Sequence, residues 1–464
     1  MSLISSISGI RGTIGGKVGE NLTPIDIVKY VSAFITLLKE NEPNKTLRIV
    51  VGRDARISGE MVSSIVCGTI QSMGADVIDV GLSTTPTVEM SVVSHKADGG
   101  IIITASHNPM QWNALKVLRN NGEFVSGADG VRIQQWVKEA NFTYAEAKKL
   151  GHYSFYENAI ADHIEKILAL EWVDVDAISR ANFNVAVDAV NSTGGIAIAQ
   201  LLKKLGVKRS TILNGEPTGV FAHNPEPLPE HLAEISNLID KNSFHVGFVV
   251  DPDVDRLAIV MENGEMFGEE YSLVAIADYI LQNQKGNTVS NLSSTRALRD
   301  ISEKYGVSYA AAAVGEVNVV EKMKETNAII GGEGNGGIIL PALHYGRDAL
   351  VGISLFLTYM AKTKKSPVQI KSQFPSYFIS KNKIELKPET NVPHILDCVA
   401  EKYKAYSVNR IDGVKVDFED NWIHLRASNT EPIIRIYAEA TNMSIAENLA
   451  KKILNDIKEI INEQ

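Results

Sequence analysis

The sequence predicts a multidomain protein of the α/β class, and three observations lead to this prediction. Helical and strand patterns alternate along most of the 464 residues. Three segments share one form, an apolar strand that ends in aspartate and a polar loop: residues 47–56, 184–195 and 245–256. The C-terminal part differs, because two strand-like runs precede one long helix. Together the patterns predict repeated α/β units with mostly parallel sheet, followed by a small α+β domain.

The N-terminal elements follow from local patterns. Residues 21–38 predict a helix that Thr23 can cap and that has Pro24 in its first turn. Its apolar stripe consists of Ile27, Val31, Phe34, Ile35 and Leu38. The next predicted elements are a buried strand, a second helix and two further strands. They span residues 47–54, 61–74, 75–81 and 99–106.

The C-terminal elements begin with the strand-like runs "WIHLRAS" and "IIRIYAEA". The terminal helix carries Leu449, Ile453, Ile457 and Ile460 on one face. At roughly 100–200 residues per domain, the chain is long enough for three or four domains. Polar stretches and the end of the third strand–aspartate segment divide it into four predicted domains: 1–150, 151–256, 257–370 and 371–464.

Composition excludes several classes of protein. Cys67 and Cys398 lie far apart and form no metal or redox motif, which favours a reducing compartment. The first residues do not have the pattern of a signal peptide, and no run approaches the ~18 apolar residues of a membrane span. The net charge of −9 argues against a nucleic-acid-binding protein but permits an anionic small ligand. We therefore expect a cytoplasmic protein.

The segment "IIITASHNP" is an apolar strand that opens onto small polar residues. Ser106 is a candidate nucleophile, although an unactivated serine needs a base, a metal or an activated phosphate. His107 is its neighbour, but neighbours in an extended segment point apart, so a Ser–His pair does not follow from adjacency. The alternative is a structural loop in which Asn108 and Pro109 cap a following helix.

A stronger candidate site is "DPDVDR", which follows the apolar run "VGFVV". Asp251, Asp253 and Asp255 alternate, so an extended backbone would place all three carboxylates on one side. They would repel each other without a cation, and oxygen ligands in this number suit Mg²⁺. Arg256 could hold a phosphoryl oxygen. A solvated acidic turn is the alternative, but the preceding strand places the triplet at the carboxyl edge of a sheet, where ligands bind.

Two further segments carry polar groups. "GGEGNGG" presents Glu333 and Asn335 but lacks the Lys and Ser/Thr of a nucleotide-binding P-loop, so it suits sugar hydroxyls or is a plain glycine turn. "RASNTEPIIR" is either a phosphate site or a polar hairpin turn. Its candidate donors are Arg426, Ser428, Asn429, Thr430 and Arg435. Because Arg435 lies between two isoleucines, we expect it to face away from the core.

Taken together, the motifs "SGIRG", "TASHNP", "DPDVDR", "GEGNGG" and "RASNTEP", in this order, resemble the α-D-phosphohexomutase family over nearly the whole chain. The resemblance implies three related mixed-sheet α/β domains and a C-terminal α+β domain of TATA-box-binding-like fold, arranged around a central cleft. It also implies an isomerase that moves phosphate between O6 and O1 of a hexose or hexosamine through a 1,6-bisphosphate.

The family's functional residues map onto this chain motif by motif. The resemblance implies that Ser106 carries a phosphoryl group and, with Asp251, Asp253 and Asp255, holds one Mg²⁺ per chain. Four residues match positions near the transferred phosphoryl group, with Lys116 as candidate general acid/base: Arg11, His107, Lys116 and Arg256. Glu333 and Asn335 match the sugar-recognition loop. The phosphate that does not react is expected at Arg426, Ser428, Asn429, Thr430 and Arg435. Glucose or glucosamine 1,6-bisphosphate is the expected activator.

Several positions depart from the family pattern. Ala114 replaces a glycine of many members, and Gly337 stands where the sugar loop often has histidine. Ser293 and Glu316 stand near positions where some bacterial phosphomannomutases have lysine and histidine. These differences favour phosphoglucosamine mutase, with phosphoglucomutase/phosphomannomutase of relaxed specificity as the alternative.

Two rival hypotheses keep the same residues. A metal-dependent sugar-phosphate phosphatase would use Ser106 and the aspartates but admit water to the phosphoserine. A catalytically silent sugar-phosphate-binding protein is disfavoured, because Ser106, Lys116 and the three aspartates are intact. The sequence leaves monomer and homodimer equally open.

Overall fold

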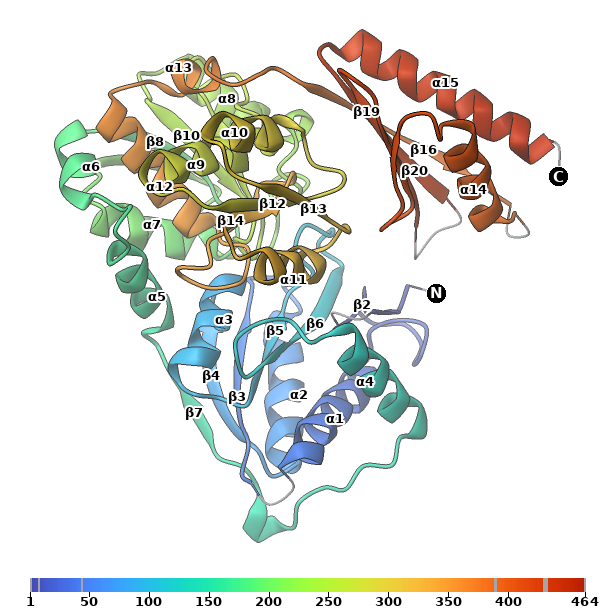
Figure 1. Ribbon diagram of the computed structural model, residues 1–464. Coiled ribbons are helices and arrows are strands. Elements are labelled where there is room, and N and C mark those ends of the chain that lie inside the picture. The colour runs from blue at the N-terminus through green and yellow to red at the C-terminus, as the bar shows by residue number, and fades with distance from the viewer. Residues whose placement is uncertain (1, 7–8, 43–44, 388–389, 429–432, 463–464) are drawn as a thin grey trace. The chain divides into compact units, whose positions relative to one another are not determined.

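The chain is described by a computed structural model that covers residues 2–6, 9–42, 45–387, 390–428 and 433–462 (Figure 1). It forms two compact units, and each unit combines two stretches of sequence. The first unit consists of Met1–Tyr279 and Gly336–Ile370, and the second of Ile280–Asn335 and Lys371–Gln464. No helix within the described residues is long and apolar enough to cross a membrane.

The first sheet of the first unit has seven strands in the order β1-β2-β6-β5-β3-β4-β7. Its central strands are parallel, whereas β1, β2 and β6 are antiparallel to their neighbours. The strands are β1 (Ile4–Ser6), β2 (Gly9–Thr13), β3 (Arg48–Arg53), β4 (Asp76–Leu82), β5 (Gly99–Ile103), β6 (Trp112–Arg119) and β7 (Tyr153–Phe155). The associated helices are α1 (Pro24–Asn41), α2 (Gly59–Ser72), α3 (Thr85–Ser94) and α4 (Gly127–Glu139).

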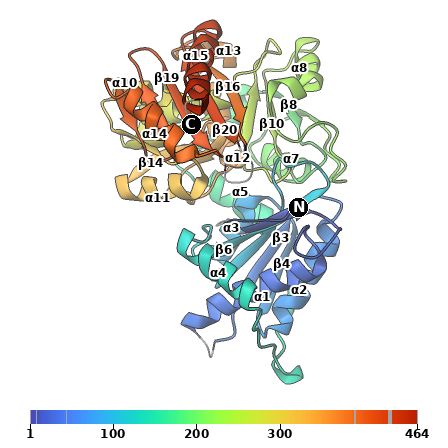
Figure 2. The ribbon, with the colours of Figure 1, turned by 90° about the vertical axis from the view of Figure 1, so that its right-hand side faces the viewer.

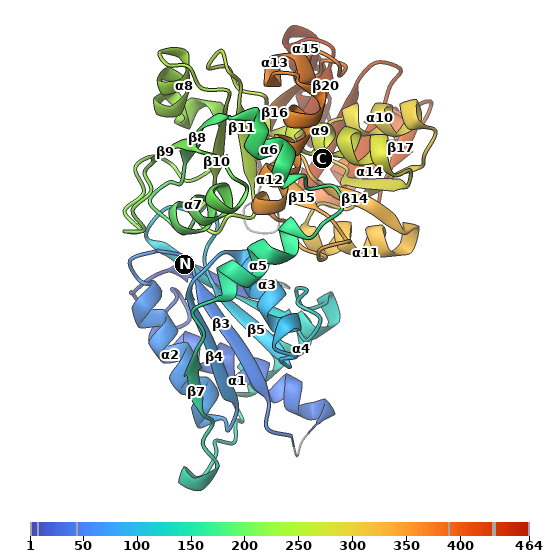
Figure 3. The ribbon, with the colours of Figure 1, turned by 90° about the vertical axis from the view of Figure 1, so that its left-hand side faces the viewer.

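Helices cover both faces of this sheet, because its central strands are apolar on both sides (Figure 3). Ile49 and Val51 of β3 pack with α1 and α2, whereas Val50 packs with α3. Helix α1 begins as predicted. Thr23 accepts the backbone N–H of Asp26, the Asp26 side chain completes a capping box, and Pro24 is the first helical residue.

The second sheet has the order β11-β10-β8-β9, in which only β11 is antiparallel. Its strands are β8 (Asn184–Asp188), β9 (Arg209–Leu213), β10 (Val246–Val250) and β11 (Leu257–Val260). The helices here are α5 (Ala159–Leu168), α6 (Val175–Ala181), α7 (Gly194–Lys204), α8 (Ala233–Asp240) and α9 (Glu269–Asn283). After residue 336 the first unit continues with β15 (Gly337–Ile339), α12 (Ala349–Thr363) and α13 (Pro367–Lys371). Helix α12 is buried from Ala349 to Met360 and packs against α5, α6 and α7.

The second unit contains one α/β part and one antiparallel part (Figure 2). In the α/β part, β12 (Asn287–Asn291) pairs in parallel with both β13 (Tyr309–Ala312) and β14 (Ala328–Glu333). Its helices are α10 (Ala297–Tyr305) and α11 (Glu316–Thr326). The antiparallel sheet has the order β16-β20-β19-β18-β17, and its core is shared with α14 and α15. These elements are β16 (Phe378–Glu385), α14 (Val392–Lys402), β17 (Ser407–Asn409), β18 (Val414–Asp417), β19 (Trp422–Ala427), β20 (Ile433–Ala440) and α15 (Met443–Asn462).

The predicted fold class is confirmed: three α/β parts precede an α+β part with an antiparallel sheet. The expectation of mostly parallel pairing holds for β3, β4 and β5, and for β8 to β10. The antiparallel strands at the sheet edges were not visible in the alternation of helix and strand patterns, because an antiparallel partner needs only a short connection. The four domain boundaries remain a prediction.

Candidate active site

Ser106 lies in the loop between β5 and β6, in the left-handed region of backbone space with φ of +49°. A non-glycine residue there is uncommon, so the surrounding structure must hold it. The Ser106 N–H donates to Thr104 Oγ1 at 2.9 Å. The turn brings His107 Nδ1 to 3.4 Å from Ser106 Oγ. The two side chains therefore lie together, whereas in an extended segment they would point apart. The alternative of a helix cap is wrong, because the loop leads into strand β6.

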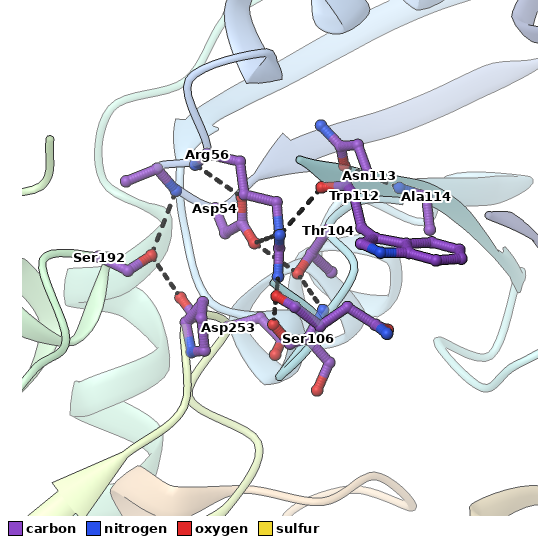
Figure 4. A network of polar contacts seen from close by, with 12 residues as sticks. Asp54, Arg56, Thr104, Ser106, Trp112, Asn113, Ala114, Ser192 and Asp253 are labelled. Carbon is purple, nitrogen blue, oxygen red and sulfur yellow. Dashed lines mark hydrogen bonds and ion pairs between the residues drawn. The ribbon is translucent and has the colours of Figure 1, made fainter. Parts of the chain in front are cut away.

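The loop is held by Arg56, whose side chain is fully buried (Figure 4). Its two terminal nitrogens donate to four carbonyl oxygens of the loop, those of Ser106, Asn108, Pro109 and Trp112, at 2.5–2.9 Å. Nε bonds the Asp54 carboxylate at 3.1 Å, and Thr104 Oγ1 donates to the same carboxylate oxygen at 2.6 Å. One buried ion pair therefore fixes both the strand end and the serine loop.

Replacing Arg56 with alanine should destabilise the protein by about 3–5 kcal/mol, since it leaves the Asp54 carboxylate buried without its counter-charge and removes four hydrogen bonds. Urea denaturation measures this loss. Arg119→Ala is the matched control, because Arg119 is exposed and its ion pair with Asp129 is worth at most about 1 kcal/mol. Equal stability of the two variants would contradict the role of Arg56.

The three aspartates of "DPDVDR" converge on one point, but not through an extended backbone. Strand β10 ends at Val250, and the chain then turns, with Val254 at a φ of +61° and its N–H bonded to the Asp251 carbonyl at 3.1 Å. The prediction that an extended backbone places the three carboxylates on one side was therefore wrong, although the three carboxylates do lie together. One oxygen of each carboxylate lies within 4.8 Å of the others. Ser106 Oγ donates to Asp251 Oδ2 at 2.7 Å.

The oxygen set at this point suits a hard divalent cation. All three aspartates are at most 1% exposed. Among the described residues, no group donates a hydrogen bond to Asp253 Oδ1 or Asp255 Oδ1, although both oxygens are buried. A buried carboxylate oxygen without a donor is costly unless a cation lies beside it. Three carboxylates and the Ser106 hydroxyl therefore fit Mg²⁺.

Basic side chains surround the triplet. Lys116 Nζ lies 2.9 Å from Asp253 Oδ2 and 3.9 Å from Asp255 Oδ2. Arg347, from the segment before α12, donates to Asp255 Oδ2 at 2.6 Å. Arg256 Nη1 lies 3.6 Å from Glu226 Oε1, and the same oxygen lies 4.0 Å from His107 Nε2.

These contacts shift several pKa values. Burial, followed by the charges of Asp255 and Asp253, raises the pKa of Asp251 well above its ordinary value. Burial alone would raise the pKa of Asp253 and lower that of Lys116, but their mutual attraction reverses both directions. Burial, with the charges of Arg256 and Arg347, lowers the pKa of His107 to about 2. His107 is therefore neutral at physiological pH.

Arg11 and Lys116 lie on neighbouring strands. In the pairing of β2 with β6, Arg11 is opposite Ala114 and Gly9 is opposite Lys116. Because side chains alternate along a strand, Arg11 and Lys116 project from the same face of the sheet. Gly9 is required at its position, since a Cβ there would lie 2.1 Å from the carbonyl oxygen of Leu115.

In the second unit, Glu333 is the last residue of β14, and the glycine-rich turn begins after it. It is 3% exposed and accepts hydrogen bonds from Asn291 Nδ2 at 2.8 Å and from the Gly315 N–H at 3.1 Å. Asn335 lies in the tight turn that follows, where the Gly334 N–H donates to Ser294 Oγ at 2.9 Å. The carboxylate is therefore fixed in place.

The candidate phosphate-binding segment lies between β19 and β20. Arg426 and Arg435 are directly opposite each other in this pair, and Arg435 is exposed, as predicted. Arg426 Nε donates to Asp412 Oδ1 at 2.9 Å. The Ser428 N–H bonds the Ile433 carbonyl at 3.0 Å. Asn429 and Thr430 lie outside the described residues.

Four residues at the serine and aspartate groups were missed by sequence reasoning: Arg56, Thr85, Glu226 and Arg347. Thr85 begins α3, and its Oγ1 donates to Asp253 Oδ2 at 2.6 Å. Arg56 stands in the first strand–aspartate segment, so that segment contained a signal for it. Thr85, Glu226 and Arg347 have no local pattern that marks them.

Three α/β parts, an antiparallel C-terminal part and a serine among buried aspartates suit an enzyme of phosphoryl transfer, and comparison with known proteins shows this class. The sequence matches the four families described as phosphoglucomutase/phosphomannomutase α/β/α domains I, II and III and the C-terminal domain, over residues 4–144, 161–264, 269–377 and 387–456. The chain belongs to the phosphoglucomutase/phosphomannomutase family, whose members are phosphohexomutases, isomerases that transfer phosphate intramolecularly.

Curated relatives carry two kinds of name. "Phosphoglucomutase/phosphomannomutase" of Thermococcus kodakarensis is 35% identical and covers 92% of this chain and 94% of its own. "Phosphoglucosamine/phosphogalactosamine mutase" of Sulfurisphaera tokodaii is 31% identical and covers 99% of each chain. The exact substrate is therefore not settled by similarity.

Solved structures share the fold. A phosphoglucomutase/phosphomannomutase family protein from Burkholderia thailandensis has a TM-score of 0.85 at 24% identity and covers 98% of this chain and 97% of its own. Two structures of Aspergillus fumigatus N-acetylphosphoglucosamine mutase have TM-scores of 0.55 and 0.57 at 15% and 14% identity. They cover 91% and 99% of this chain and 85% and 96% of their own. The first is a complex with GlcNAc-6P and magnesium, and the second, a serine-to-alanine variant, is a complex with glucose 1,6-bisphosphate.

Proposed function

We propose that this phosphohexomutase interconverts the 6-phosphate and 1-phosphate of glucosamine, and that Ser106 carries the phosphoryl group. The observation that supports this role most directly is the position of Ser106 Oγ, 2.7 Å from Asp251 Oδ2 beside two further buried carboxylates. Asp251, Asp253, Asp255 and Ser106 would hold Mg²⁺, which supplies positive charge against the oxygens of the transferring phosphoryl group.

The protein's own groups have separate tasks in each half-reaction. A sugar hydroxyl oxygen forms a bond to phosphorus as the bond from phosphorus to Ser106 Oγ breaks. The sugar hydroxyl gives up its proton and Ser106 Oγ gains one. Lys116 is the proposed acid/base for the sugar oxygen, since a cation held by the aspartates would offset the Asp253 and Asp255 charges that raise its pKa. Asp251 accepts the hydrogen bond of the free serine. Arg11, Arg256 and the neutral His107 are proposed donors to phosphoryl oxygens.

The second half-reaction uses the other end of the bisphosphate, since one serine must serve both O6 and O1. We propose that Arg426, Ser428, Asn429, Thr430 and Arg435 hold the phosphate that does not react. The opposed pair Arg426 and Arg435 supports this, because it places two guanidinium groups, which are good phosphate donors, opposite each other on neighbouring strands. Glucose or glucosamine 1,6-bisphosphate is the proposed activator, in line with the bisphosphate complex of the Aspergillus enzyme.

The preferred sugar is tested by kcat/KM for glucosamine, glucose and mannose phosphates measured in parallel. We expect the highest value for glucosamine phosphate, since Gly337 replaces the histidine common in other sugar loops. Similar values for all three sugars would instead establish relaxed specificity. Release of one inorganic phosphate per turnover would favour the phosphatase hypothesis.

Glu333 and Asn335 are proposed to recognise sugar hydroxyls, because a carboxylate accepts hydrogen bonds from hydroxyls but repels phosphate. Glu333→Ala should therefore lower kcat/KM about 10- to 100-fold, the scale of one or two lost hydrogen bonds to a charged group. In this variant the bisphosphate should still phosphorylate Ser106, which intact-mass spectrometry measures. Glu333→Gln is the control, since it can still accept from Asn291 and Gly315. Parallel loss of serine phosphorylation and turnover would contradict this separation.

A further inference from the structure

A second group of metal-ligating side chains lies in the first unit, apart from the three aspartates. Its members are Glu89 of α3, His163 of α5, His344 of the segment before α12, and Asp348, the N-cap of α12. Asp348 Oδ2 lies 2.9 Å from His163 Nε2 and 3.3 Å from His344 Nε2. His344 Nδ1 lies 3.2 Å from Glu89 Oε2. The proposed phosphoryl transfer uses none of these four residues.

The three inner atoms have the spacing of a metal shell. One ligand atom from each of His163, His344 and Asp348 lies within 4.8 Å of the other two. With zinc–ligand bonds of about 2.0–2.1 Å, tetrahedral ligands are about 3.3 Å apart. The distance of 3.3 Å from Asp348 Oδ2 to His344 Nε2 equals that separation, and the distance of 2.9 Å to His163 Nε2 is somewhat shorter. Two imidazoles and one carboxylate suit zinc and related cations better than Mg²⁺, which prefers oxygen ligands.

Each inner ligand is also held from behind. His163 Nδ1 pairs with Thr87 Oγ1 at 2.9 Å, and His344 Nδ1 faces Glu89. Asp348 Oδ1 accepts the N–H groups of Leu350 and Val351, which leaves Oδ2 directed at the histidines. Outer partners of this kind fix the tautomer and orientation of histidines that bind metals.

The charge of the cluster favours a cation. Glu89, His163 and Asp348 are at most 2% exposed, and the His344 side chain is 11% exposed. The two carboxylates thus create a strongly negative field. An ion that displaces the proton from His344 meets two neutral imidazoles and two carboxylates, whose two negative charges balance one divalent cation.

We propose that His163 Nε2, His344 Nε2 and Asp348 Oδ2 bind one divalent cation of the zinc class, with Glu89 as the outer partner of His344. Water can complete the shell on the side where His344 is exposed. The ion joins α5 to the start of α12. Glu89 and Thr87, which hold the two histidines, connect these elements to α3, so the task of the ion is structural. The proposal does not rest on the proposed phosphoryl transfer, since no residue is shared with it.

The test measures metal binding, not activity. Full-length protein is treated with a chelator, equilibrated with Zn²⁺, passed through a desalting column and measured for zinc content. Wild type should retain about one zinc per chain. Asp253→Asn should retain the same amount, because that variant alters only the aspartate site. His163→Ala and His344→Ala should each bind zinc at least about 100-fold more weakly, and Glu89→Gln about 10- to 100-fold more weakly, as expected for an outer partner. His152→Ala, at an exposed histidine, is the matched control.

Co²⁺ provides a second measurement that needs no variant. Titration of chelator-treated wild type with Co²⁺ should produce the visible absorption of a four-coordinate ion at one equivalent, and Zn²⁺ should abolish it. Absence of this absorption, or zinc retention by His344→Ala equal to that of wild type, would overturn the proposal. Loss of zinc in Asp253→Asn alone would assign the ion to the aspartate site and overturn it as well.

Discussion

Ser106→Ala is expected to abolish interconversion of the two sugar phosphates, with kcat reduced by more than about 10⁴-fold. Removal of a nucleophile that forms a covalent intermediate acts on this scale. The protein should remain folded, because the change deletes one oxygen and leaves the four bonds from Arg56 to the loop carbonyls in place. Circular dichroism and the thermal midpoint check the fold, and a coupled assay checks the activity.

Mass spectrometry gives an independent result for the same variant. Wild type incubated with glucose 1,6-bisphosphate should gain one phosphoryl group in the peptide that contains Ser106, and Ser106→Ala should gain none. Wild type should also release almost no inorganic phosphate per turnover. A variant with normal mutase rate would show that Ser106 is not the carrier.

Asp253→Asn should lower kcat by at least about 100-fold, since the loss of one ligand weakens a metal ion that contributes several kcal/mol to phosphoryl transfer. The remaining activity should require a higher Mg²⁺ concentration, which a magnesium titration measures. Two effects are combined in this variant, because Asp253 Oδ2 also accepts hydrogen bonds from Lys116 and Thr85.

Thr85→Val separates those two effects. It removes one hydrogen bond to Asp253 while it keeps the carboxylate and the shape of the side chain. We expect a smaller loss of activity and an unchanged Mg²⁺ requirement. If Asp253→Asn retains the wild-type rate and magnesium dependence, the three aspartates do not form the metal site.

Much of the fold could be predicted because the decisive signals are local. The cap and apolar stripe of α1 lie within 18 residues, and the apolar run of β10 leads directly into the aspartates. The alternation of such patterns fixes the α/β class. The order of the strands depends on pairings between distant segments, and no pattern in one sequence records these pairings.

The same distinction applies to the candidate site. Ser106 and the three aspartates could be predicted because both groups stand in short polar segments that follow an apolar strand. Arg347 could not, since it reaches Asp255 across 92 residues of sequence. The left-handed conformation of Ser106 was also hidden, because serine rarely adopts it and one of the groups that hold it, Arg56, lies 50 residues away in the sequence.

The chain path through the first unit has a consequence for synthesis on the ribosome. This unit is interrupted after Tyr279 and is completed only by Gly336–Ile370, which contains the buried helix α12. About 90 residues, from Ile280 to Ile370, must be translated before the unit is complete. This takes about 5–20 s at 5–20 residues per second. During that interval the nascent α5, α6 and α7 expose the apolar surfaces that α12 later covers. A chaperone that binds short apolar segments has its target there, and only until Ile370 has left the exit tunnel.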